Sequence, residues 1–188
     1  MFYNSDMKDL ILVVDMQNAY EKGMPWECRS MERTKENIIK LLSTGEDAVF
    51  TAFIASDNPE GAWKKYSEAN REINEDKRAN EIVPELLPYL KEHKLFYKDR
   101  YSSLSNNELR KLVAEYDRVV VTGVVAECCV LSTVFSLIDA GVPFLYIRDA
   151  VSGLNEKTES ETEDILSGLV LVHGEIMNTD EYICSIFG

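Results

Sequence analysis

Histidine is nearly absent from this chain of 188 residues, which has two, His93 and His173. The four cysteines form no C-x-x-C pair, so the sequence predicts neither a Cys/His zinc site nor a disulfide framework. Acidic residues outnumber basic ones by 33 to 20, and the net charge of −13 repels nucleic acids and anionic membranes. We therefore expect a small molecule as the partner, with no metal and no cofactor.

Long apolar segments are missing as well. No run approaches the roughly 18 residues of a membrane-spanning helix, and residues 1–10 lack the basic and apolar regions of a signal peptide. The expected location is cytoplasmic, with reduced thiols. The composition is 45% hydrophobic and 10% aromatic, without repeats or a linker, which predicts a single globular domain over residues 1–188.

Short apolar runs alternate with segments of helical periodicity along the chain. This alternation predicts an α/β fold in three α/β/α layers, a Rossmann-like parallel sheet with helices on both faces. The predicted strands are residues 9–14, 48–54, 95–98, 118–122, 143–147 and 175–177. The predicted helices are residues 29–42, 63–73, 81–90, 105–116 with a capping box of Ser105 and Glu108, 130–140, 156–173, and a last one from residue 179.

The most informative stretch is 118–140, RVVVTGVVAECCVLSTVFSLIDA. A β-branched strand is followed by Gly123, which breaks it, and then by a helix. Cys128 and Cys129 fall where the turn becomes the helix, beside unpaired N–H groups and the positive end of the helix dipole. A thiol in such a position tends to ionise, and it has backbone donors ready for an oxyanion. The alternative is that both cysteines are small buried hydrophobic residues.

Two charged residues stand at the ends of other predicted strands. Asp15 directly follows the run 9–14, and Lys98 closes the run 95–98. Taken singly, Asp15 can be a loop cap and Lys98 a solvated surface group. In parallel α/β sheets, however, ligands bind beyond the carboxyl ends of the strands. Because Asp15, Lys98 and Cys129 all stand at such ends, the sequence predicts an enzyme.

Three motifs in this order resemble those of the isochorismatase-like cysteine hydrolase family, which includes nicotinamidases and N-carbamoylsarcosine and biuret amidohydrolases. They are LILVVDMQNAY, FYKDRYSSL and VVVTGVVAECCVLST, beginning at residues 10, 96 and 119. The resemblance implies a six-stranded sheet in the order 3-2-1-4-5-6 and a catalytic triad of Asp15, Lys98 and Cys129. It also implies a cis peptide bond between Val124 and Val125, whose N–H forms an oxyanion hole with that of Cys129.

The chain departs from the family pattern at two places. Metal-dependent nicotinamidases carry an Asp-x-His pair and a further His after the second strand, where this chain has AFIASDNPEGAW. Ala126 and Glu127 stand where many members have Thr and Asp. Isochorismatases often lack the cysteine and cleave a vinyl ether, so the presence of Cys129 favours C–N hydrolysis.

We therefore predict a cysteine hydrolase that cleaves a small amide, ureide or carbamoyl compound through a thioester. The candidate substrate-binding residues are Gln17, Tyr20 and Trp63. For Trp63 the alternative is a structural role in the hydrophobic core. Within the family, the alternatives are a metal-free nicotinamidase-like or an isochorismatase-like hydrolase. Outside it, the alternatives are a redox sensor using Cys128 and Cys129, or a non-catalytic ligand-binding protein. The resemblance to the family also implies a homo-oligomer. The substrate is selected by loop residues, whose arrangement the sequence pattern does not predict.

Overall fold

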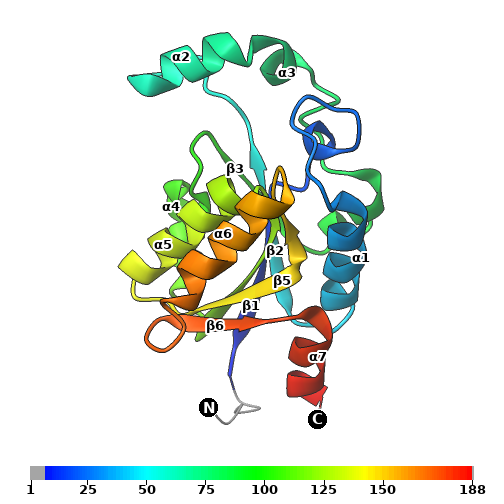
Figure 1. Ribbon diagram of the computed structural model, residues 1–188, viewed down its shortest axis with the longest axis vertical. Coiled ribbons are helices and arrows are strands. Elements are labelled where there is room, and N and C mark those ends of the chain that lie inside the picture. Colours follow the sequence, from blue (N-terminus) through cyan, green and yellow to red (C-terminus); the bar gives the residue numbers. More distant parts are fainter. Residues whose placement is uncertain (1–6, 188) are drawn as a thin grey trace.

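The protein forms a six-stranded parallel sheet with the strand order 3-2-1-4-5-6, as predicted (Figure 1). The computed structural model describes residues 7–187. The strands are β1 Asp9–Val14, β2 Asp47–Phe53, β3 Lys94–Lys98, β4 Arg118–Val124, β5 Phe144–Ser152 and β6 Gly174–Met177. The order reverses direction next to β1, so the carboxyl ends of β1, β2, β3 and β4 meet at the crevice where such sheets bind ligands.

Helices cover both faces of the sheet and complete the three predicted layers. The helices are α1 Met31–Leu42, α2 Ala62–Ala69, α3 Arg71–Glu75, α4 Asn107–Val113, α5 Leu131–Asp139, α6 Glu156–Ser167 and α7 Thr179–Phe187. Figure 1 shows α1 and α7 on one face and α4, α5 and α6 on the other. The α/β prediction is therefore confirmed.

The core is divided by the sheet into two apolar clusters, and β1 contributes to both. Ile11 and Val13 belong to the cluster under α1 and α7, whereas Leu10, Leu12 and Val14 belong to the cluster under α4, α5 and α6. Successive strand residues point to opposite faces, so a continuous apolar run is what a strand buried on both sides requires.

Several predicted boundaries were wrong. The helix predicted from Ser105 begins at Asn107, because the Asn106 side chain caps it by accepting the N–H groups of Glu108 and Leu109. Residues 81–90 form two 3₁₀ turns, Pro84–Leu86 and Tyr89–Lys91, instead of one helix. Prolines at 84 and 88 supply no N–H for a continuous helical ladder.

Gly123 lies inside β4 and does not end it. It has a φ of 101°, and a Cβ added there would lie 2.1 Å from the Val14 carbonyl oxygen. Only glycine therefore allows β1 and β4 to approach this closely. Two other predicted lengths were also wrong. The strand predicted to end at residue 147 continues to Ser152, and the helix predicted to end at residue 173 ends at Ser167.

The segment that carries α2 and α3 stands apart from the three layers, beyond the carboxyl ends of the strands (Figure 1). No residue of α2 is buried. Within residues 7–187, the longest apolar helix falls short of what is needed to cross a membrane.

Candidate active site

The structure brings together the three residues that the sequence singled out at strand ends. Asp15 follows β1, Lys98 is the last residue of β3, and Cys129 lies in the turn between β4 and α5. The Lys98 ammonium is 2.6 Å from Asp15 Oδ2 and 3.4 Å from the Cys129 sulfur. Both charged side chains have no exposed surface, so this ion pair and the thiol are shielded from water.

Asp15 is held by the neighbouring strand β2. Its φ of 50° is in the left-handed region, and its backbone N–H donates to the Thr51 carbonyl at 3.2 Å. The Thr51 hydroxyl donates to Asp15 Oδ1 at 2.8 Å. Sequence reasoning missed Thr51, because a threonine in a strand is ordinary and its partner lies 36 positions away.

Lys98 is a cation with three contacts. Besides Asp15 and Cys129, its ammonium donates to the Arg100 carbonyl oxygen at 3.0 Å. Burial opposes the charged form, but the charges of Asp15 and Cys129 outweigh burial, and the pKa of Lys98 is raised above its usual value. The raised pKa favours the charged form of Lys98.

The surroundings of Cys129 oppose ionisation of its thiol, whereas its place at the start of a helix favours ionisation. Burial raises the pKa of Cys129, and the charge of Asp15 and a hydrogen bond to that carboxylate raise it further, while Lys98 lowers it. The sulfur is nearly inaccessible, at 4% residue exposure. A thiol whose pKa is raised has to pass its proton to a base before it can attack.

The turn that carries Cys129 contains the cis peptide bond between Val124 and Val125. The N–H of Val130 donates to the Val125 carbonyl at 3.1 Å, so residues 126–130 form a wide π turn before α5 begins. The Thr133 hydroxyl is 2.7 Å from the Cys129 carbonyl, and it accepts the N–H of Ser103 at 2.9 Å. This contact joins the turn to the loop that follows Lys98.

Six aromatic rings, here called the aromatic cover, pack against one another beside Lys98. Tyr20 and Trp63, the two predicted pocket residues, are among them, together with Trp26, Phe53, Tyr66 and Tyr101. The Trp63 ring lies 5.1 Å from Tyr66 and 5.0 Å from Tyr101. Phe53 faces the Lys98 ammonium at 5.5 Å from the ring centre. Burial, followed by the charges of Cys129 and Asp15, raises the pKa of Tyr20.

Gln17, the third predicted substrate-binding residue, is held by the backbone through its side-chain amide. Its amide NH₂ donates to the carbonyl oxygens of Phe53 and Asn80, at 3.0 and 2.8 Å, and its oxygen accepts the Phe53 N–H at 2.8 Å. Both NH₂ protons are therefore taken by backbone groups, and the side chain is 1% exposed. Gln17 continues the pairing of β1 with β2 beyond the end of β1.

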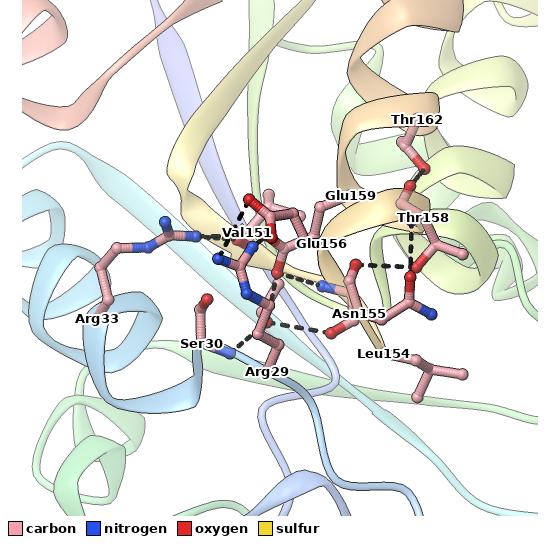
Figure 2. A network of polar contacts seen from close by, with 12 residues as sticks. Arg29, Ser30, Arg33, Val151, Leu154, Asn155, Glu156, Thr158, Glu159 and Thr162 are labelled. Carbon is pink, nitrogen blue, oxygen red and sulfur yellow. Dashed lines mark hydrogen bonds and ion pairs between the residues drawn. The ribbon is translucent and has the colours of Figure 1, made fainter.

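A polar network connects the loop after β5 with the segment before α1 (Figure 2). Glu159, in the first turn of α6, accepts the Gly153 N–H at 3.0 Å and binds Arg29 at 3.2 Å. The Arg29 N–H donates to the Gly153 carbonyl oxygen at 3.0 Å. Glu127, two residues before Cys129, accepts the Leu154 N–H at 3.2 Å. The segment before α1, the loop after β5 and the turn that carries Cys129 are therefore connected by hydrogen bonds.

The site is closed in this conformation. A small pocket of about 10 Å³, lined in part by Phe53, Trp63 and Tyr66, lies next to the aromatic cover. A larger groove of about 680 Å³ lies between residues 55–60 and the α2–α3 segment, and none of the three buried residues lines it. Among residues 7–187, no three His, Cys, Asp or Glu side chains converge in a way that could hold a metal ion.

Comparison with known proteins connects this geometry to a family. The isochorismatase domain matches residues 9–179, whereas a search of curated proteins finds no match. The structure is similar to a cysteine hydrolase from Pseudomonas syringae pv. phaseolicola, with a TM-score of 0.83 and 18% identity over 99% of this chain and 95% of that one. It is also similar to an isochorismatase-like hydrolase from Alkaliphilus metalliredigens, with a TM-score of 0.77 and 20% identity over 99% of each chain.

A nicotinamidase from Bacillus subtilis has a TM-score of 0.73 and 17% identity, over 92% of this chain and all of that one. At such identities the solved structures show a shared fold, and the domain match supplies the relationship. This chain therefore belongs to the isochorismatase-like cysteine hydrolase family.

Proposed function

We propose that this enzyme hydrolyses the C–N bond of a small amide, ureide or carbamoyl compound through a thioester on Cys129. The proposal rests on one observation, the Lys98 ammonium lying between the Asp15 carboxylate, at 2.6 Å, and the Cys129 sulfur, at 3.4 Å. A buried thiol beside a base and a fixed cation is the arrangement that nucleophilic acyl transfer requires.

Asp15 is the proposed base. The Cys129 thiol gives its proton to the Asp15 carboxylate, and Lys98 stabilises the thiolate that forms. The sulfur then bonds to the carbonyl carbon, and the N–H groups of Val125 and Cys129 stabilise the oxyanion. As the C–N bond breaks, Asp15 returns the proton to the leaving nitrogen.

The second half of the reaction uses the same groups. Water attacks the thioester, Asp15 takes a proton from it, and the carbon–sulfur bond breaks. The proton then returns to the sulfur, which restores the neutral thiol. No histidine is needed in this scheme, because one carboxylate accepts and returns each proton.

The aromatic cover is the proposed binding surface for the rest of the substrate. Tyr20 and Trp63 belong to one cluster of packed rings, whose flat apolar surfaces suit a planar group conjugated to the reacting carbonyl. Since Cys129 is 4% exposed, the cover has to move before a substrate can enter. Trp63 and Tyr66 sit on α2, which has no buried residue, so α2 can move without opening the core.

Ammonia release from nicotinamide, biuret and N-carbamoylsarcosine tests the proposal. We expect release from at least one compound, together with an acyl adduct on Cys129 in rapidly quenched samples analysed by mass spectrometry. Cys129→Ala should abolish turnover and retain binding, whereas Cys184→Ala, at an exposed thiol, should match the wild type. Normal ammonia release by Cys129→Ala would show that the covalent scheme is wrong.

A further inference from the structure

Thr51 is tied to Asp15 by both its backbone and its side chain. The Asp15 N–H lies 3.2 Å from the Thr51 carbonyl oxygen and 3.3 Å from its hydroxyl oxygen. The same hydroxyl donates its proton to Asp15 Oδ1 at 2.8 Å. Both residues have no exposed surface, so water does not compete for these contacts. The hydroxyl of Thr51 therefore donates its proton to the Asp15 carboxylate and not to water.

The two carboxylate oxygens of Asp15 are held from different strands. Lys98, at the end of β3, lies 2.6 Å from Oδ2, and Thr51, in β2, donates to Oδ1. The terminal torsion of an aspartate is broad, so an ion pair to a single oxygen leaves the carboxylate free to rotate. A threonine in a strand is stiff at χ1 and supplies the second fixed point.

We infer that Thr51 is a positioning residue, which fixes the Asp15 carboxylate in the orientation that receives the Cys129 proton. This inference rests on the proposed function, because it gives Asp15 the role of base. Thr51 acts through the carboxylate, to which its hydroxyl donates. Packing alone does not require the hydroxyl here, since valine has nearly the same shape and is a better apolar filler for a buried strand.

The chain offers a matched control on the opposite side of β1. Thr122 in β4 is also fully buried, and its hydroxyl donates to the Leu12 carbonyl oxygen at 3.1 Å. Thr122→Val thus removes a buried hydroxyl hydrogen bond between neighbouring strands without touching Asp15. Thr51→Ser keeps the hydroxyl and removes only a methyl group.

The experiment measures alkylation of Cys129 by iodoacetamide at pH 7, followed residue by residue by mass spectrometry in variants shown to be folded by circular dichroism. Thr51→Val should slow alkylation about tenfold, the rate equivalent of one lost hydrogen bond to a charged group. Thr51→Ser and Thr122→Val should stay within about threefold of the wild type. Added to Asp15→Asn, Thr51→Val should cause no further slowing, because the two residues then act as a unit.

Two other results are informative, one against the role of Thr51 and one against the proposed function. If Thr51→Val matches Thr122→Val, or slows alkylation equally in the Asp15→Asn background, Thr51 does not act through Asp15 and the inference is wrong. In that case a reactive wild-type Cys129 leaves the proposed function intact. If the wild type forms no acyl adduct on Cys129 and releases no ammonia from any of the three amides, the proposed function fails, and the role of Thr51 with it.

Discussion

Replacing Lys98 by methionine removes the fixed charge and keeps most of the apolar stem. With an effective dielectric constant of about 20, a unit charge 3.4 Å from the sulfur favours a thiolate by about 5 kcal/mol. Rearrangement of the site recovers part of this, so we expect a loss of about 10³-fold in the rate of Cys129 alkylation and in kcat. The direction follows from the structure, since Lys98 lowers the pKa of Cys129 against burial and Asp15.

Stability has to be measured beside activity. Lys98→Met leaves the Asp15 carboxylate buried without its cation, which costs about 3–5 kcal/mol of unfolding free energy. Asp15→Asn combined with Lys98→Met removes both charges and should recover most of this loss in urea denaturation. Lys94→Met is the surface control, because Lys94 and Glu108 form an ion pair between side chains that are 61% and 76% exposed, worth about 0–1 kcal/mol.

The refuting result is specific. If Lys98→Met is folded and its Cys129 is alkylated within about threefold of the wild-type rate, Lys98 does not stabilise the thiolate, and the reasoning from the 3.4 Å contact is wrong. A rate loss in the Lys94→Met control would point to a general effect of lost positive charge on the fold or on reagent access.

Two further predictions follow from the surroundings of the site. Because burial and Asp15 raise the pKa of the Cys129 thiol, its thiolate fraction decreases at lower pH, and its alkylation rate should still be rising above about pH 9, where a free cysteine levels off; a plateau near pH 8 would contradict the burial argument. Glu159→Ala removes the acceptor for Ser152 and Gly153 and should lower the unfolding free energy by about 1–3 kcal/mol in urea denaturation. Glu161→Ala, on the same helix but exposed, should change it by less than about 0.5 kcal/mol, and equal losses in both variants would refute a specific role for the network.

The sequence by itself determined the sheet and the edge where chemistry is expected. The run DLILVV is apolar at every position except its first, and this pattern suits only a strand buried on both faces. Once alternating strands and helices imply a parallel sheet, all strand ends share one edge, so Asp15, Lys98 and Cys129 were expected at that edge, and the family resemblance implied that they form a triad. The shared edge follows from the topology, whereas the contacts of 2.6 and 3.4 Å between the three groups come from the structure.

Tertiary structure alone decided how those groups are held and charged. Gln17 was expected to face the substrate, but its amide pairs with Phe53 and Asn80, which lie 36 and 63 positions away. The hydroxyl of Thr51 meets Asp15 across an equal separation of 36 positions. No local pattern marks such pairs, because periodicity reports which face a residue occupies and not which atom it meets.

The pKa of Cys129 likewise depends on one local factor and on others that only the tertiary structure supplies. Its place at the start of a helix favours a thiolate, and that much is local. Its burial and the carboxylate beside it, which together raise the pKa of the thiol, exist only after β1, β3 and β4 have assembled. Desolvation depends on everything packed around an atom, so the charge state of the nucleophile is a property of the folded chain and not of its motif.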